Sequence, residues 1–261
     1  MILKDKVAVI YGAGGDVGGA VARAFAREGA KLFLSGRTLD KVKAVAADII
    51  ARGGVAEAAQ VDALDEQAVE KYVDAVAKKA GTIDISFSAI SYALPNKAPL
   101  LELSAEHFAL PIAALTQSNF LTARSAARRM VARRSGVILT ITGTPSRLAF
   151  ANVGGTAPAY AAIVALTRSL SVELAPQGVR AVCLMPNAIP ETATIRENFA
   201  RYAKAMNITP AQFLAQIESM THLKRLTTLA EIANAAVFVA SDHASAMTGT
   251  VVNLSGGAVA E

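Results

Sequence analysis

The chain of 261 residues is 53% hydrophobic and only 18% charged, which excludes intrinsic disorder and predicts a folded domain with a large core. Its apolar runs are far shorter than the roughly 20 residues of a transmembrane helix, so we expect no membrane association. A single cysteine, Cys183, excludes an internal disulfide, and the N-terminal segment carries charges where a signal peptide needs apolar residues. Both features predict a cytoplasmic protein.

The net charge of +5 makes nucleic acid a partner to consider. The densest basic cluster lies at residues 124–134, at the C-terminal end of a predicted helix, where the helix dipole favours cations. The sequence shows neither of two features typical of nucleic-acid-binding proteins, zinc ligands at a regular spacing and a basic strand with interleaved aromatic residues. The three histidines lie far apart in the sequence. We therefore expect neither nucleic-acid binding nor a metal site.

Short β-branched runs alternate with alanine-rich helical stretches along the whole chain. The pattern predicts strands at 7–10, 32–34, 55–61, 83–87, 136–141, 179–185 and 251–254, and helices at 17–28, from 38, from 65, at 117–134, ending near 174, and at 230–240. Because the strands are continuous apolar runs, helices should cover both faces of the sheet. The sequence predicts an α/β fold: one Rossmann-like domain over 1–261, with a doubly wound parallel sheet of about seven strands.

Residues 190–227 break this alternation. They contain two short helical patterns, the second preceded by a capping signal at Thr209 and Gln212. The segment follows the sixth predicted strand, at the edge of the sheet where such folds bind ligands. We expect a lid over the pocket of a small-molecule substrate; the alternative is an extension that only contributes packing.

A glycine-rich turn follows the first predicted strand and opens a helix. Gly12, Gly14, Gly15 and Gly18 lie in this turn, in the context that a dinucleotide-binding fingerprint requires. Glycines let the backbone approach a pyrophosphate, and the helix N-terminus stabilises its charge. The turn predicts a nucleotide site rather than a purely structural turn.

The second predicted strand ends in Arg37, and no acidic residue lies between Ala30 and Leu39. An NAD site places a carboxylate here to bind the ribose 2′-hydroxyl, whereas a guanidinium pairs with a 2′-phosphate. The pattern favours NADP(H), with a solvated loop arginine as the alternative. Asp62, after the third strand, is a candidate acceptor for the adenine amino group.

Several segments match one protein family, namely YGAGGDVG, SGR, VDALD, IDISFSAIS, SGVILTIT, ALTRSLSVELAPQGVRAVCLMPN and MTGTVVNLSGG. With these, the chain resembles the short-chain dehydrogenase/reductase family over essentially its whole length. The resemblance implies a cofactor site formed by Gly12, Gly14, Gly15, Asp16, Val17, Gly18, Arg37, Asp62, Ala63, Ser88, Ala89, Ile90, Thr142, Tyr160, Pro186 and Ile189. It also implies a homodimer or homotetramer formed through the helices at 117–134 and 161–174.

The glycine turn departs from the pattern of the compact family members, which carry a glycine where Asp16 stands. The spacing of Gly12, Gly15 and Gly18 resembles that of the extended members instead. A carboxylate beside a pyrophosphate is repulsive unless it points away.

The resemblance implies four catalytic residues, an asparagine, a serine, a tyrosine and a lysine. Alignment from both sides places them at Leu115, Gly143, Thr156 and Tyr160, so all four positions carry other residues. The chain has no lysine between Lys97 and Lys204, so no other register restores the pair of tyrosine and lysine. An unassisted tyrosine is a poor base at neutral pH, which prevents the family's usual acid/base chemistry.

Two interpretations follow. In the first, the protein is an NADP(H)-dependent oxidoreductase that acts on a small carbonyl, alcohol or enone with other acid/base residues. The candidates are Tyr160, Thr144 and Thr156, with Arg147 as a stabiliser of negative charge. In the second, it is a catalytically silent NADP(H)-binding protein, a sensor or a scaffold.

Overall fold

Seven parallel strands, in the order β3-β2-β1-β4-β5-β6-β7, form the centre of the computed structural model, which describes residues 1–92 and 98–260. The strands are β1 (Val7–Tyr11), β2 (Lys31–Gly36), β3 (Val55–Gln60), β4 (Ile85–Ser88), β5 (Gly136–Ile141), β6 (Val179–Pro186) and β7 (Val251–Leu254). The predicted doubly wound sheet is confirmed, and its strand boundaries differ from the expected ones by at most two residues. The strand order reverses between β1 and β4, which creates a crevice at the carboxyl edge of the sheet.

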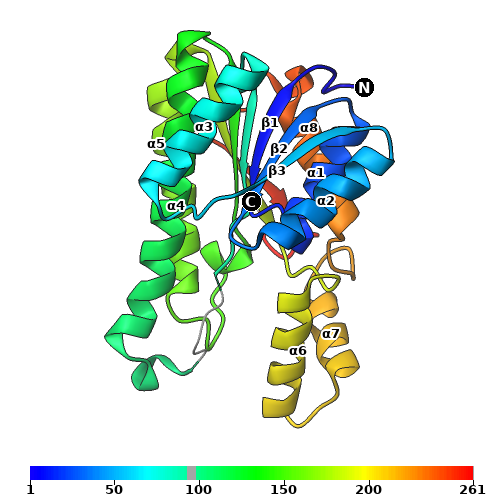
Figure 1. Cartoon of the computed structure of the whole chain (residues 1–261). Helices are drawn as coiled ribbons and strands as arrows, with labels where there is room; N and C mark the ends of the chain where they lie inside the picture. The colour runs from blue at the N-terminus through cyan, green and yellow to red at the C-terminus, as the bar shows by residue number, and fades with distance from the viewer. Residues whose placement is uncertain (93–97, 261) are drawn as a thin grey trace.

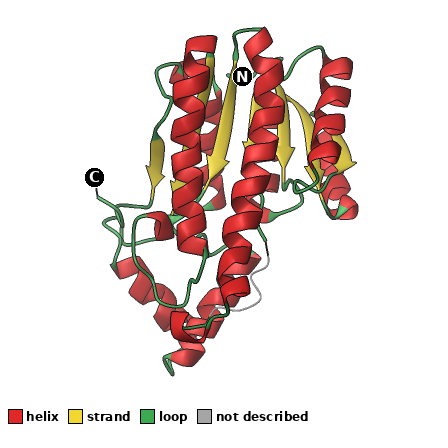
Figure 2. Cartoon of the chain, turned by 90° about the vertical axis from the view of Figure 1, so that its left-hand side faces the viewer, coloured by secondary structure: helices red, strands yellow, loops and turns green. Residues whose placement is uncertain are grey.

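Helices cover both faces of this sheet (Figures 1 and 2). On one face lie α1 (Asp16–Arg27), α2 (Leu39–Ala51) and α8 (Leu229–Ala240), and on the other lie α3 (Glu66–Ala80), α4 (Ala105–Ala132) and α5 (Thr156–Leu174). Four short 3-10 turns complete the described elements: η1 (Leu100–Glu102), η2 (Thr144–Ser146), η3 (Ala175–Gln177) and η4 (Asp242–Ala244). Alternate residues of β1 belong to two separate cores, since Ala8 and Ile10 pack toward α1 while Val7 and Val9 pack toward α3. Apolar residues are therefore needed at every position of β1.

Helix α4 begins at Ala105, twelve residues before the expected start at 117, so that prediction was wrong. Ser104 caps the helix by accepting a hydrogen bond from the backbone N–H of His107. Pro111 lies in the second turn, where it removes one backbone donor without ending the helix. The extra turns carry α4 past the carboxyl edge of the sheet. There, a Cβ atom at Gly155 would lie only 2.0 Å from the carbonyl oxygen of Phe108.

The arginines of the basic cluster are paired with acids or with a carbonyl oxygen. Their partners are Glu66 for Arg124, Glu70 for Arg128, Glu70 and Asp74 for Arg129, Asp84 for Arg133, and the Pro176 carbonyl for Arg134. Most of these acids lie on α3, so the cluster joins α3 to α4. This arrangement agrees with the expected structural role of the cluster.

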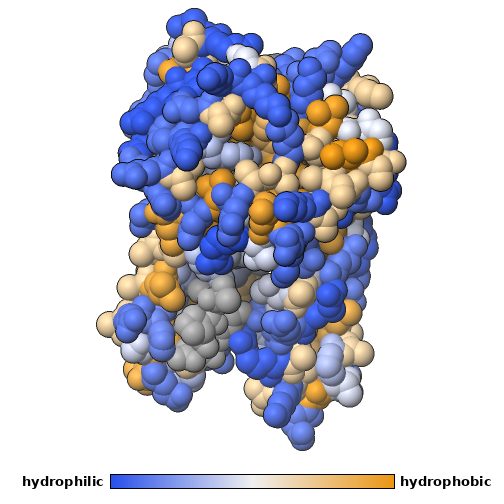
Figure 3. Space-filling model, viewed as in Figure 1, coloured by the Kyte–Doolittle hydropathy of each residue, from blue (hydrophilic) through white to orange (hydrophobic). Residues whose placement is uncertain are grey.

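The segment at residues 190–227 forms two antiparallel helices, α6 (Ala193–Ala205) and α7 (Pro210–Ser219), as its sequence predicted. They project away from the carboxyl edge of the sheet (Figure 1), and a hollow separates them from the start of α4 on the face shown in Figure 3. The ring of Phe213 on α7 packs against Phe199 and Tyr202 on α6. Thr209 and Gln212 form the expected capping box. None of the described helices has the length and apolarity needed to cross a bilayer.

Candidate active site

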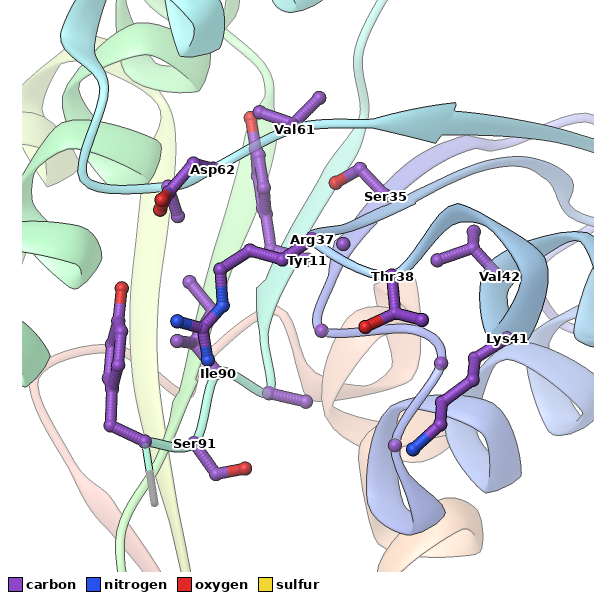
Figure 4. Close-up of a pocket in the computed structure, with 17 residues that line it drawn as sticks. Tyr11, Ser35, Arg37, Thr38, Lys41, Val42, Val61, Asp62, Ile90 and Ser91 are labelled. Atoms are coloured by element: carbon purple, nitrogen blue, oxygen red, sulfur yellow. The ribbon is translucent and has the colours of Figure 1, made fainter. Parts of the chain in front are cut away.

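A pocket of about 200 Å³ opens at the carboxyl ends of β1, β2 and β4 (Figure 4). Eight of the predicted cofactor residues line it: Gly12, Gly14, Gly15, Arg37, Asp62, Ala63, Ala89 and Ile90. The chain also brings Tyr11, Ser35, Gly36, Thr38, Lys41, Val42, Val61, Ser91 and Tyr92 to its wall. The pocket therefore lies where the glycine turn predicted a nucleotide site.

The glycine turn closes so tightly that two of its positions exclude any side chain. A Cβ atom at Gly12, which has φ +72°, would lie 2.5 Å from the carbonyl oxygen of Ala89. A Cβ atom at Gly18 would lie 2.3 Å from the carbonyl oxygen of Gly12. Helix α1 begins directly after Gly15 without a side-chain cap. Its first N–H groups and the helix dipole are available to an anion such as a pyrophosphate.

Asp16 is the first residue of α1, but its side chain does not line the pocket. Its Oδ2 accepts a hydrogen bond of 2.8 Å from the backbone N–H of Ala193, the first residue of α6. The carboxylate thus points away from the glycine turn, as compatibility with a bound pyrophosphate requires. The partner could not have been predicted, because it lies 177 residues further along the chain.

Two cations enter the pocket from neighbouring positions. Arg37 follows β2, and its guanidinium carbon lies 4.7 Å above the centre of the Tyr92 ring. Lys41 lies in the first turn of α2, whose N-cap residue Thr38 makes no side-chain capping bond. Figure 4 shows Arg37 and Lys41 at different sides of this one pocket. Lys41 was missed from the sequence, because no local pattern shows which side of α2 faces the pocket.

The remaining predicted cofactor residues lie outside the pocket wall: Asp16, Val17, Gly18, Ser88, Thr142, Tyr160, Pro186 and Ile189. Four of them, Ser88, Thr142, Pro186 and Ile189, lie at or just beyond the ends of β4, β5 and β6. The hydroxyl of Ser88 is buried with no hydrogen-bond partner among the described residues. Thr142 is also buried, and its hydroxyl lies 3.5 Å from the sulfur of Cys183.

The four positions aligned with the family's catalytic residues do not form a polar cluster. Tyr160 is partly buried and packs with Leu115, Ile112 and Tyr92 in one apolar group. A Cβ atom at Gly143 would lie 3.2 Å from Cε2 of the Tyr160 ring. Burial raises the pKa of the Tyr160 phenol, so this hydroxyl remains protonated at neutral pH.

The two candidate threonines have different environments. Thr144 is buried on η2, and its Oγ1 lies 3.3 Å from Oδ1 of Asn187, to which it donates a hydrogen bond. Thr156 begins α5, and its Oγ1 is buried without a hydrogen-bond partner among the described residues. Asn187, which directly follows β6, was not among the predicted site residues. Arg147 is exposed just beyond η2.

Within residues 1–92 and 98–260, no three His, Cys, Asp or Glu side chains come together as a metal site would require. The candidate catalytic residues Tyr160, Thr144 and Thr156 carry hydroxyls, and Asn187 carries a carboxamide. These groups can donate or accept hydrogen bonds but supply no strong base.

Comparisons with known proteins agree with this geometry. A family model described as Enoyl-(Acyl carrier protein) reductase matches residues 12–259. The chain is 28% identical to the uncharacterised oxidoreductase YxjF of Bacillus subtilis, over 99% of this chain and 100% of that protein. Sorbitol-6-phosphate 2-dehydrogenase SrlD from Erwinia amylovora superposes with a TM-score of 0.92 at 26% identity, covering 97% of this chain and 100% of that one. A candidate NAD(P)-dependent gluconate 5-dehydrogenase from Beutenbergia cavernae, with NADP bound at low occupancy, has a TM-score of 0.87 at 31% identity, covering 99% and 98% of the two chains.

Proposed function

Because the chain belongs to the short-chain dehydrogenase/reductase family, we propose that it is an NADP(H)-dependent oxidoreductase acting on a small carbonyl, alcohol or enone. The observation that carries the choice of cofactor is the presence of two cations, Arg37 and Lys41, on the wall of one pocket at the end of β2. Their positive charges match a ribose 2′-phosphate, which Arg37 can hold through two parallel hydrogen bonds. NADP(H) supplies or accepts the hydride when it is bound.

The end of β2 also disfavours the carboxylate that an NAD site needs. Gly36 occupies that position, and a Cβ atom there would lie 3.1 Å from Cγ2 of Val42. A longer acidic side chain would have to displace Val42 or turn into the space near Arg37. The pocket therefore fits the phosphorylated cofactor better than the unphosphorylated one.

The glycine turn and the start of α1 suit the pyrophosphate of the cofactor. Gly12 and Gly18 lie where only hydrogen fits, because the carbonyl oxygens of Ala89 and Gly12 lie close to them, so these glycines let the turn pack tightly against the start of α1. The uncapped start of α1 offers its N–H groups to the two phosphate charges. Asp62 and Ala63, at the opposite wall, would contact the adenine. Val17 and Ser88 would continue the contacts toward the ribose and nicotinamide.

We assign the proton transfer to Tyr160. Its phenol is protonated at neutral pH, and burial, which raises its pKa, favours this neutral form further. It can therefore donate a hydrogen bond or a proton to a substrate oxygen. It is a poor base in the reverse direction, which makes reduction easier than oxidation. Thr144 and Thr156 are weaker candidates, because a threonine hydroxyl is a much weaker acid than a phenol. Thr144 also donates its hydrogen bond to Asn187.

We further propose that α6 and α7 act as a lid over the substrate and that the protein assembles as a homodimer or homotetramer through α4 and α5. The lid is supported by the position of the two helices directly after β6. The assembly is supported by large apolar side chains exposed on both helices, Phe120 on α4 and Val172 on α5. A cytoplasmic location remains our expectation from the lone Cys183.

A direct test measures the binding of NADPH and NADH to the purified protein by fluorescence titration, followed by NADPH oxidation with a panel of substrates. The panel includes ketoses and sugar acids, because two structural neighbours carry the names of dehydrogenases for sorbitol 6-phosphate and gluconate. Tighter binding of NADPH and turnover of a carbonyl or enone support the proposal. Equal affinity for both cofactors contradicts the cofactor assignment. Binding of NADPH without turnover of any compound supports the silent NADP(H)-binding protein instead.

A further inference from the structure

Asp16 lies between the N-termini of two helices that are far apart in the sequence. It is the first residue of α1, and its Oδ2 accepts the hydrogen bond of 2.8 Å from Ala193 at the start of α6. A carboxylate is stabilised by the positive end of a helix dipole, and here two such ends lie beside it. Asp16 therefore caps α6 with a side chain from outside that helix.

The start of α6 has its own local cap, to which Asp16 adds. The Thr192 hydroxyl accepts a hydrogen bond from the N–H of Ile195 and donates one to the carbonyl oxygen of Ile189. Because a helix leaves its first four N–H groups without partners inside the helix, the Ala193 N–H remains for another acceptor. Asp16 supplies that acceptor from the glycine turn.

A second acid holds the opposite side of the same junction. The Glu191 carboxylate accepts a hydrogen bond of 2.5 Å from the N–H of Leu229, the first residue of α8. Glu191 thus ties the entrance of the α6–α7 segment (residues 190–227) to α8, while Asp16 ties it to α1. The outer part of the segment is held mainly by contacts between α6 and α7 themselves, such as those around Phe213.

We propose that Asp16 is a positioning residue that couples the cofactor-binding turn to the α6–α7 segment. The inference rests on the proposed cofactor site at the start of α1. A pyrophosphate bound there repels the Asp16 carboxylate and competes for the α1 dipole, which drives the carboxylate toward the Ala193 N–H. Cofactor binding thereby strengthens the hydrogen bond that holds α6. By thermodynamic linkage, an α6 held in place favours the cofactor by the same factor.

The test is hydrogen exchange of the amides in residues 190–205, measured with and without NADPH. In the ligand-free protein we expect Asp16→Ala to speed exchange at the start of α6 about two- to tenfold, the effect of losing one hydrogen bond. Asp16→Asn keeps an acceptor oxygen and should exchange nearly as the wild type does. Asp40→Ala, which removes an exposed acid from the first turn of α2, is the matched control and should leave α6 unchanged.

With saturating NADPH, the wild type should gain protection at the start of α6, and Asp16→Ala should gain much less. The ligand-free comparison tests the hydrogen bond between Asp16 and Ala193 without any cofactor. If NADPH fails to bind, the proposed function is refuted, and the ligand-free exchange rates still show whether the hydrogen bond holds α6. Equal ligand-free exchange in wild type and Asp16→Ala would overturn the proposal. Fast exchange in Asp16→Asn would also overturn it, because the acceptor would then not be what holds α6. Asp16 is exposed, so folding of the variants should be preserved, and Asp16→Gly provides a second variant without the acceptor.

Discussion

The ring of Tyr160 occupies the space into which a side chain at Gly143 would project. A Cβ atom at Gly143 would lie 3.2 Å from Cε2 and 3.7 Å from Cδ2 of that ring. The backbone of Gly143 is extended, with φ −161° and ψ 171°, a conformation that any residue adopts. The ring, rather than the backbone, therefore restricts this position. The two residues aligned with the family's serine and lysine are thus matched to each other in space.

This contact makes Gly143→Ser unfavourable while Tyr160 is present. We expect the serine to destabilise the protein by about 1 kcal/mol, because the added atoms force the ring to shift within a packed group. Tyr160→Ala removes the ring, so the double variant should be more stable than the sum of the two single changes predicts, by about 0.5–1 kcal/mol. Urea denaturation of the four proteins measures this coupling. Strict additivity would show that the ring can move aside without cost.

The alternation of apolar strands and alanine-rich helices was sufficient to predict the seven-stranded sheet. Buried parallel strands need apolar residues on both faces, so β1 is a continuous apolar run and β6 is one apart from Arg180, and such runs can be recognised in the sequence. The start of α4 at Ala105 was not predicted, and Pro111 lies inside the helix, where it removes one backbone hydrogen bond. The tertiary contact between Gly155 and α4 favours the additional turns.

The candidate site was predictable where its residues are close in sequence and less so where they are not. The glycine turn and Arg37 follow their strands directly, and the fold places both at the carboxyl edge. A prediction of Lys41 as a pocket residue would have required knowledge of which side of α2 faces the pocket. The partner of Asp16 and the stack of Arg37 on Tyr92 depend on tertiary packing between distant segments, which no local pattern encodes.

Arg37 and Lys41 should contribute unequally to cofactor selectivity. A charge-assisted hydrogen bond contributes about 1.5–3 kcal/mol, so Arg37→Ala should weaken NADPH binding roughly 10- to 100-fold. Lys41→Ala removes a compact charge from an exposed position and should have a smaller effect. Neither variant should change the affinity for NADH by more than about twofold, because NADH has no 2′-phosphate.

Fluorescence titration with both cofactors measures these affinities. Lys43→Ala is the matched control, because Lys43 is exposed on the same helix but does not line the pocket. If Arg37→Ala lowers the affinities for NADPH and NADH equally, Arg37 maintains the shape of the pocket and does not bind the 2′-phosphate.

The capping box of α8 should make thermal stability depend on acid pH. The side chain of Arg225, and then the backbone N–H of Thr228, lower the pKa of Glu231 from 4.5 to about 2. A carboxylate with a lowered pKa stabilises the folded state above its unfolded pKa and loses that contribution as pH falls through the folded value. The stabilisation should therefore be complete above pH 5 and decline between pH 4.5 and 2.

Glu231→Gln retains the capping geometry but cannot ionise. Its Tm should lie below that of the wild type at pH 6, and the difference should shrink at pH 3. Salt should reduce the difference as well, because the ion pair with Arg225 is exposed. Glu173→Gln, an exposed acid on α5, is the control. A difference in Tm that is independent of pH would show that the ionisation of Glu231 is not its cause.

Tyr160 should be the side chain on which turnover depends most. It lies one helical turn beyond Thr156 on α5, so both side chains share one face of that helix. As a neutral phenol it can hydrogen-bond the nicotinamide ribose or a substrate oxygen, and its raised pKa keeps the proton in place at neutral pH. Tyr160→Phe removes only the hydroxyl and retains the packing against Gly143 and Leu115. We expect NADPH affinity to fall by about 0.5–1.5 kcal/mol, and reductase turnover to fall by roughly two to four decades.

Steady-state kinetics and NADPH titration of Tyr160→Phe and Thr156→Ala separate binding from proton transfer. Thr156→Ala should reduce turnover much less, because its hydroxyl is buried without a partner among the described residues and is a far weaker acid. Because the phenol must be protonated to act, reduction by the wild type should be constant around neutral pH and decline only above the ordinary tyrosine pKa near 10. Turnover that survives the loss of the Tyr160 hydroxyl would exclude its role as the acid. Thr144, which donates to Asn187 at the same edge of the sheet, would then be the next residue to replace.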